Sequence, residues 1–256
     1  MNSNNNALSL LDPEQKRAGQ LGLWGLVAHW HEVPSELRKR LCDAQTTERF
    51  ARSLARREQS SRIGNFKPIH DFDWSWPTQI DRQVVEELMT GSFLTDAVNP
   101  VLIGPTGTGK TMLAKNIAHG ALLRGRTVRI TSVAEMLADL ARNTAPEARP
   151  RALRRYLSPA LLVLDDFGQR AYDNREADEI FTVIAARHQR RSTMLATQSS
   201  FAQWQQLFPN AACAYKLIDL LAHVSEVIDI EGESYRLHEA VQRKARMEKV
   251  RTQART

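Results

Sequence analysis

The feature that most constrains this chain is the glycine-rich stretch GPTGTGKT at residues 104–111. It fits the pattern G-x-x-x-x-G-K-[ST], in which glycines let backbone N–H groups turn inward around phosphate oxygens and the following helix N-terminus adds attraction. An apolar run precedes the stretch (100–104) and a helical pattern follows it (110–124). A glycine turn without a ligand is the alternative, but the strand–loop–helix setting favours a phosphate-binding loop.

Within this loop, each residue type has an expected task. We expect Lys110 to reach the β- and γ-phosphates of a nucleotide and Thr111 to place its hydroxyl on Mg²⁺. The predicted nucleotide-binding residues are Gly104, Pro105, Thr106, Gly107, Thr108, Gly109, Lys110, Thr111 and Met112.

A phosphate-binding loop of this kind needs a metal-holding acid at the end of a neighbouring strand. The segment LLVLDDFG (161–168) supplies one, because apolar residues lead directly into Asp165 and Asp166. We expect Asp165, together with Thr111, to hold Mg²⁺ and Asp166 to activate a water. The alternative is that these two acids only solvate the end of a strand. The phosphate-binding loop at 104–111 makes the functional interpretation the better one.

The paired acids favour hydrolysis by water over transfer to a bound acceptor, and the chain shows no insertion of the kind that a small-molecule kinase needs. Gln198 follows the predicted strand 192–197 and would orient the water or sense the γ-phosphate. A strand-end polar residue without such a role is an equal alternative. The predicted catalytic residues are Lys110, Asp166 and Gln198.

Strand and helix patterns alternate from about residue 98, which predicts a mostly parallel α/β sheet covered on both faces. Before that point the chain is helical in pattern. The predicted parts are a helical N-terminal domain for DNA or partner docking (1–67), a linker with the first helix of the ATPase unit (68–97), the ATPase core (98–238) and a basic, frayed C-terminal tail (239–256).

The amino-acid composition gives little information about the function. The chain has 256 residues, 42% of them hydrophobic, with 35 Lys and Arg against 29 Asp and Glu, a weak hint of a polyanionic partner. The start MNSNNN does not have the pattern of a secretory signal, and the apolar stretch 21–30 is too short to span a bilayer. Cys42 and Cys213 show no metal or redox spacing. We expect a cytoplasmic protein without membrane contact.

Four segments together resemble one family: VLIGPTGTGKTMLA, LLVLDDFG, RRSTMLATQSSFAQW and IEGESYR. They are similar to the IstB-like transposition helper ATPases of bacterial insertion sequences, relatives of the DnaC-type helicase loaders in the AAA+ class. The resemblance covers about residues 70–237. It implies a P-loop AAA+ core with a five-stranded parallel sheet of order 5-1-4-3-2 and little or no helical lid, preceded by a small all-helical domain.

The resemblance also implies a function. Such a protein hydrolyses ATP to ADP and phosphate with Mg²⁺, forms a homo-oligomer on duplex DNA, and recruits or activates a DDE-type transposase for insertion-sequence transposition. Two alternatives stay open: a DnaC-like helicase loader, and an ATP-binding adaptor with little hydrolysis.

One departure from the family bears on hydrolysis. Relatives carry an arginine finger in a segment like LIDRL, but here the segment is KLIDLLAH (216–223) with Leu220 at that position. Leu220 cannot stabilise a neighbour's γ-phosphate, so we expect slow hydrolysis. Other cations could substitute: Lys216, Arg187, Arg190 and Arg191. A smaller departure is Asp166, where Glu is more usual.

Two basic stretches bear on DNA. The stretch 142–156 has one acid, Glu147, and five arginines that we predict to contact DNA: Arg142, Arg149, Arg151, Arg154 and Arg155. The predicted helix that starts at Ser35 is also basic, with subunit or transposase docking as the competing role. A solvated helix face is the alternative for both stretches.

Overall fold

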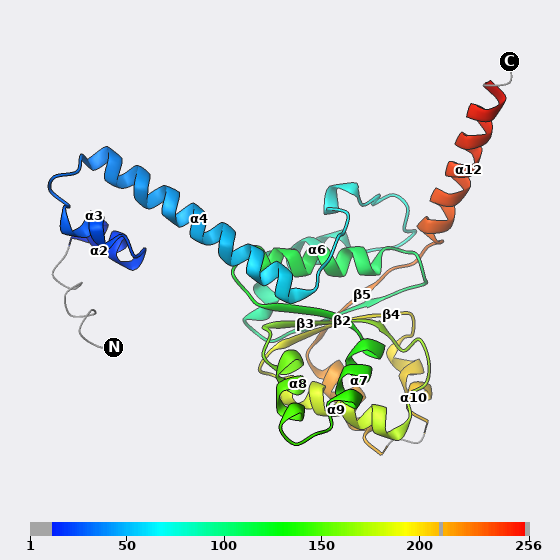
Figure 1. Cartoon of the computed structure of the whole chain (residues 1–256). Helices are drawn as coiled ribbons and strands as arrows, with labels where there is room; N and C mark the ends of the chain where they lie inside the picture. Colours follow the sequence, from blue (N-terminus) through cyan, green and yellow to red (C-terminus); the bar gives the residue numbers. More distant parts are fainter. Residues whose placement is uncertain (1–11, 210–211, 254–256) are drawn as a thin grey trace. The chain divides into compact units, whose positions relative to one another are not determined.

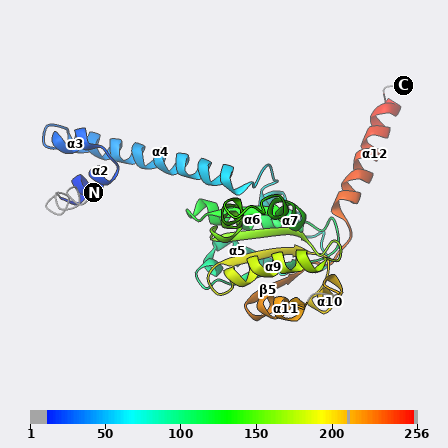
Figure 2. The same cartoon turned by 60° about the horizontal axis from the view of Figure 1, so that its bottom comes forward.

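The computed structural model describes residues 12–209 and 212–253 (Figures 1 and 2). The chain divides into two compact units between Arg56 and Arg57, inside helix α4 (Ser35–Ser61). The domain limits expected from the sequence remain a prediction. No helix in the described part of the chain is long and apolar enough to cross a membrane.

The first unit is a small helical body. It contains α2 (Pro13–Gln20), α3 (Trp24–Ala28) and the first part of α4. Its core is formed by Ala18, Trp30 and Cys42, all nearly inaccessible to solvent. The helical character predicted for the N-terminal part is confirmed for these residues.

The second unit is built on a five-stranded parallel sheet of order β2-β3-β4-β1-β5. This is the predicted order 5-1-4-3-2, counted from the opposite edge. Both faces of β1 and β4 are buried, as continuous apolar runs in parallel sheets require. The strands are β1 (Asn99–Ile103), β2 (Val128–Ser132), β3 (Leu161–Phe167), β4 (Ser192–Thr197) and β5 (Ser225–Asp229).

Helices cover both faces of the sheet (Figure 1). One face carries α5 (Arg82–Thr90) and α6 (Lys110–Leu123). The other carries α7 (Val133–Arg142), α8 (Ala148–Leu157), α9 (Asn174–Arg187) and α11 (Ala214–His223). The remaining short elements are η2 (Ile69–Asp71), η3 (Ser92–Leu94), η4 (Phe201–Gln203) and α10 (Trp204–Leu207).

Two of these helices begin at residues whose side chains cap the helix N-terminus. Ser132 caps α7 and Asp173 caps α9, each in a reciprocal capping box with a glutamate three residues on. Ser132 is also the last residue of β2, so its cap fixes where the chain leaves that strand for the covering layer. The Asp173 cap fixes the start of α9 after the loop that follows β3.

The C-terminal segment corrects one expectation. After β5 the chain leads into α12 (Tyr235–Gln253) without an intervening helix, which agrees with the predicted lack of a lid. The frayed tail predicted from residue 239 is wrong as far as Gln253, because this stretch is helical. Its Ala, Arg, Lys, Gln, Glu and Met residues favour helix and it contains no Gly or Pro. Residues 254–256 lie outside the described part.

Arg187, at the end of α9, is almost fully buried. Its guanidinium donates hydrogen bonds to the carbonyls of Tyr156 (2.9 Å), Pro159 (2.9 Å) and Ser192 (2.5 Å) and to the hydroxyl of Thr193 (3.0 Å). It thereby joins the end of α8 to the starts of β3 and β4. The prediction that Arg187 could serve as an arginine finger is therefore wrong, because a buried side chain cannot reach a neighbouring subunit.

Replacing Arg187 with Met should lower the free energy of unfolding by about 3–5 kcal/mol, because several buried carbonyls lose their donor at once. Urea denaturation measures the change. Arg191→Met is the matched control, since Arg191 is exposed, and should change stability by less than about 0.5 kcal/mol. A loss below about 1 kcal/mol for Arg187→Met would contradict the assigned role.

Candidate nucleotide-binding site

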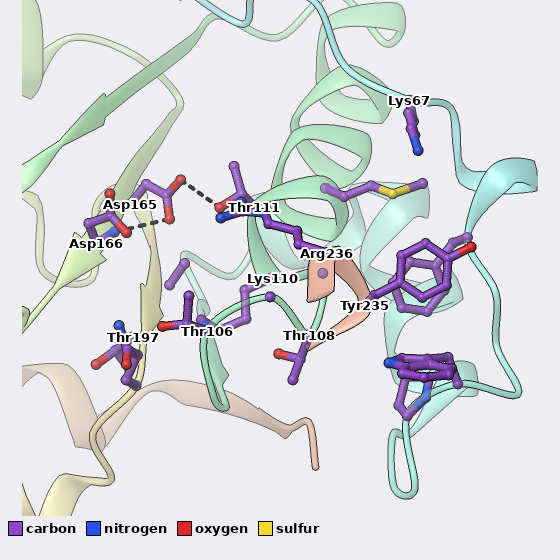
Figure 3. A pocket seen from close by; sticks show the side chains of 18 of the residues that line it. Lys67, Thr106, Thr108, Lys110, Thr111, Asp165, Asp166, Thr197, Tyr235 and Arg236 are labelled. Carbon is purple, nitrogen blue, oxygen red and sulfur yellow. Dashed lines mark hydrogen bonds between the residues drawn. The ribbon is translucent and has the colours of Figure 1, made fainter. Parts of the chain in front are cut away.

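A cavity of about 570 Å³ lies where the phosphate-binding loop meets the carboxyl ends of β3 and β4 (Figure 3). Three parts of the chain line it: the loop and first turn of α6 (106–112), the linker before α5 (67–77), and the first turn of α12. Asp165, Asp166 and Gln198 complete the wall on the strand side. The cavity thus brings together most of the residues predicted to bind nucleotide.

The loop backbone is held in its turn by glycines. Gly107 (φ 86°) and Gly109 (φ 99°) take left-handed conformations that disfavour a side chain. Gly104 is needed for space, because a Cβ there would lie 2.3 Å from the carbonyl oxygen of Ile230. The Tyr235 N–H also donates to the Gly107 carbonyl at 3.0 Å. The segment after β5 therefore packs directly on the loop.

Lys110 begins α6 and folds back over the loop. Its Nζ donates to the carbonyls of Gly104 (2.8 Å) and Pro105 (2.7 Å). Burial lowers the pKa of Lys110, while the nearby carboxylates of Asp165 and Asp166 raise it. An ammonium already partly desolvated beside phosphate-binding N–H groups is well placed to interact with an anion.

Thr111 and Asp165 join the start of α6 to β3. The Thr111 hydroxyl donates to Asp165 Oδ2 at 2.9 Å, and the Asp166 N–H donates to Asp165 Oδ1 at 3.0 Å. A hydroxyl beside a carboxylate is an oxygen donor set that fits Mg²⁺ completed by phosphate and water. No group of three or more His, Cys, Asp or Glu in the described residues offers an all-protein metal site.

Asp166 has an unusual backbone. Its φ of 57° is left-handed, and the β3–β4 register shifts between Leu164 and Phe167. Such strain in a non-glycine residue is often found at functional sites. Burial and the charge of Asp165 raise the pKa of Asp166, and a hydrogen bond from Gln169 lowers it. Gln198 is exposed directly after β4 and faces the same cavity.

Sequence reasoning missed the aromatic end of the cavity. Trp76 in the linker lies edge-on to Tyr235 of α12, with ring centroids 5.6 Å apart, and its Nε1 donates to the Glu233 carbonyl at 2.9 Å. Lys67 and Glu239 form an ion pair of 2.9 Å at the same wall. The segment IEGESYR, which contains Tyr235, was recognised as a family motif in the sequence. No sequence pattern indicated that it lies next to Trp76.

Arg236 is a second residue that sequence reasoning missed. It follows Tyr235 in α12 and lines the cavity, in view with Lys110 and Thr111 in Figure 3. Its positive charge lowers the pKa of both Lys110 and Asp166. The chain therefore brings a guanidinium to the phosphate side of the cavity from its own C-terminal helix.

The position of the family's arginine finger is apolar and packed. Leu220 is half-buried against the hydrophobic core on α11. Lys216, one turn earlier, is exposed, with its Nζ 5.6 Å from the centroid of the Phe181 ring. Arg190 and Arg191 are exposed, so a role for either in a neighbouring subunit stays a prediction.

The five arginines predicted to contact DNA lie away from the cavity and differ among themselves. Arg149 is held by Glu179 and by the Leu140 carbonyl. Arg155 pairs with Asp139, and Arg142 donates to a carbonyl of its own helix. Arg151 and Arg154 are exposed without a side-chain partner among the described residues.

The comparisons with known proteins bear directly on this site. The model of the family described as IstB-like ATP binding protein matches residues 32–243. The chain belongs to this family. The resemblance found in the sequence is thus confirmed, and the family is one of ATP-binding proteins.

Relatives within the IstB-like family come from insertion sequences. The chain is 30% identical over 220 residues to an ATP-binding protein of insertion sequence IS5376 from Geobacillus stearothermophilus, covering 84% of this chain and 88% of the relative. It is 32% identical over 205 residues to the IS21 ATP-binding protein of Pseudomonas aeruginosa, covering 79% and 77%.

Solved structures agree on the fold. The DnaC helicase loader superposes with a TM-score of 0.53 at 16% identity, covering 69% of this chain and 99% of that one. DnaI superposes with a TM-score of 0.52 at 18% identity, covering 69% and 92%. These likenesses confirm the predicted fold of the core.

Replacing Gly104 with Ala should lower the affinity for a fluorescent ATP analogue at least tenfold, because the new Cβ would push the loop away from the Ile230 carbonyl. Overpacking of this kind costs about 1–3 kcal/mol of stability. Gly25→Ala is the control, since Gly25 has open space around its Cβ position. Equal affinities for both variants would show that loop position does not govern nucleotide binding.

Proposed function

We propose that this IstB-like protein binds and hydrolyses ATP with Mg²⁺ and works as a DNA-bound helper of a transposase. The observation that carries the nucleotide part is the 2.9 Å contact between the Thr111 hydroxyl and Asp165, at the N-terminus of α6. It places a hydroxyl and a carboxylate beside the loop that Lys110 closes. The family membership supports ATP as the nucleotide.

In this proposal, loop N–H groups and Lys110 neutralise the β- and γ-phosphates. Thr111 and Asp165 hold Mg²⁺, which when bound stabilises charge on the phosphate oxygens. Asp166 accepts a proton from the attacking water as a general base. Gln198 orients that water from the end of β4.

Arg236 supplies a cation that the arginine-finger position lacks. It reaches the cavity from within the same chain and already interacts electrostatically with Lys110 and Asp166. A guanidinium near the γ-phosphate would stabilise the charge that develops there. Hydrolysis would then proceed in each subunit, at a rate below that of a site completed by a neighbour.

The DNA and transposase parts rest on the relatives and on charge. The relatives named above are ATP-binding proteins of insertion sequences. Exposed Arg151 and Arg154 on α8 offer guanidinium groups to backbone phosphates. We infer a homo-oligomer assembled on duplex DNA that recruits a DDE-type transposase.

A second candidate is an ATP-binding adaptor that hydrolyses little. The half-buried position of Leu220 in the core favours it, because that point of α11 offers no cation to a neighbouring subunit. ATP binding, rather than turnover, would then set the lifetime of the DNA complex.

Leu220→Arg should raise the DNA-stimulated rate of phosphate release at least tenfold and shorten the lifetime of the complex on labelled duplex DNA, because it returns a planar cation to the neighbour's γ-phosphate. Steady-state phosphate release and DNA dissociation measure the two effects. Lys110→Ala should abolish release in either background, and Leu220→Met controls for disturbed packing.

If wild type already turns over as fast as Leu220→Arg, another cation completes the site and the adaptor candidate is wrong. The variant, Arg236→Ala or Lys216→Ala, that lowers the rate of phosphate release then identifies this cation. No nucleotide binding by wild type would refute the whole proposal.

A further inference from the structure

Three arginines lie around the edge strand of the sheet, away from the nucleotide cavity. Arg129 lies on the edge strand β2, Arg62 follows the end of α4, and Arg155 lies on α8. We call these three residues the edge cluster. None of them lines the nucleotide cavity, so the proposed ATPase chemistry does not account for them.

Arg129 is the centre of the edge cluster and is only half-exposed. Its guanidinium lies 5.9 Å from the centroid of the Tyr156 ring, and its Nη1 donates to the Ser60 carbonyl at 3.3 Å. Its Nε is buried and makes no hydrogen bond to the described residues. A guanidinium that is partly desolvated yet incompletely bonded is costly unless an anion approaches it.

The positive charge of the edge cluster is not balanced locally. Burial lowers the pKa of Arg129, and the like charges of Arg62 and Arg155 lower it further. The carboxylate that pairs with the cluster is Asp139, 3.1 Å from Arg155. The same carboxylate oxygen already accepts a 2.7 Å hydrogen bond from the Tyr156 hydroxyl. Among the described residues, Asp139 is therefore the one carboxylate in an ion pair with the edge cluster, and it pairs with Arg155 alone.

The edge cluster also continues along α8. Arg151 lies four residues before Arg155, so the two lie on the same helix face, and Arg151 is exposed. A row of guanidinium groups suits a ligand with repeated negative charge better than a single anion. Duplex DNA carries one charge per about 1.7 Å of its axis, and guanidinium forks match phosphate oxygens.

We propose that the edge cluster of Arg62, Arg129 and Arg155 binds backbone phosphates of duplex DNA. The inference rests on the proposed DNA-binding function and names a contact surface for it. It differs from the prediction made from the sequence, in which the arginines of 142–156 and the basic helix that starts at Ser35 were two separate candidates for DNA contact. Here the end of α4 and the edge strand contribute as much as α8.

The test measures binding of the full-length protein to a fluorescent 50-base-pair duplex by anisotropy, with ATP and Mg²⁺, over a salt series. Arg62→Gln and Arg129→Gln should each weaken binding several-fold, and the double variant at least tenfold. The slope of log affinity against log salt should fall by about 2 in the double variant, because two phosphate contacts are lost.

Arg175→Gln is the matched control, because Arg175 is exposed on α9 without a side-chain partner among the described residues. It should leave both affinity and slope unchanged. Arg129→Lys keeps the charge but loses the fork, and should bind between wild type and Arg129→Gln. Arg62→Gln changes an exposed side chain, so its result stands even if Arg129 variants fold poorly.

The outcomes separate this inference from the proposed function. If wild type binds duplex DNA and the double variant keeps its affinity and slope, the edge cluster does not contact DNA. If wild type does not bind duplex DNA at all, the proposed DNA function fails as well. If the variants lose ATP-dependent self-association measured without DNA, the cluster binds a neighbouring subunit, and the inference is overturned.

Discussion

The hydrogen bond between the Thr111 hydroxyl and the Asp165 carboxylate connects the two halves of the candidate site. It exists because the loop after β1 and the acids near the carboxyl end of β3 lie at the same edge of the sheet, with β4 between the two strands. This order also brings Gln198, directly after β4, to the same cavity. With a different strand order these three functional segments would not meet. The proposed chemistry therefore depends first on the topology of the sheet and then on the individual side chains.

Much of this arrangement could be predicted from the sequence. The apolar runs before Gly104 and Asp165 mark buried parallel strands, and the glycine spacing fixes the loop between strand and helix. These are local signals, each contained in a few neighbouring residues. The strand order itself came from the family resemblance, since no local pattern determines which strands become neighbours.

The rest depended on contacts between distant residues. Trp76 meets Tyr235 across more than half of the chain, and both are ordinary aromatic residues in sequence. Arg187 looks like any exposed arginine at a helix end, yet carbonyls from two other segments enclose it. The edge cluster likewise combines a helix end, a strand and a second helix. Packing of the whole unit creates these sites, so sequence spacing does not reveal them.

We propose that the loop, Thr111 and Asp165 form a single metal–nucleotide site, and the rest of the proposed chemistry depends on it. A crystal structure with a non-hydrolysable ATP analogue and Mn²⁺ in place of Mg²⁺ tests it most directly. We predict an anomalous peak at direct coordination distance from Thr111 Oγ1 and from phosphate oxygens, with Asp165 bound directly or through water. An analogue bound in the loop with Mn²⁺ elsewhere, or an analogue bound outside the cavity, would contradict it.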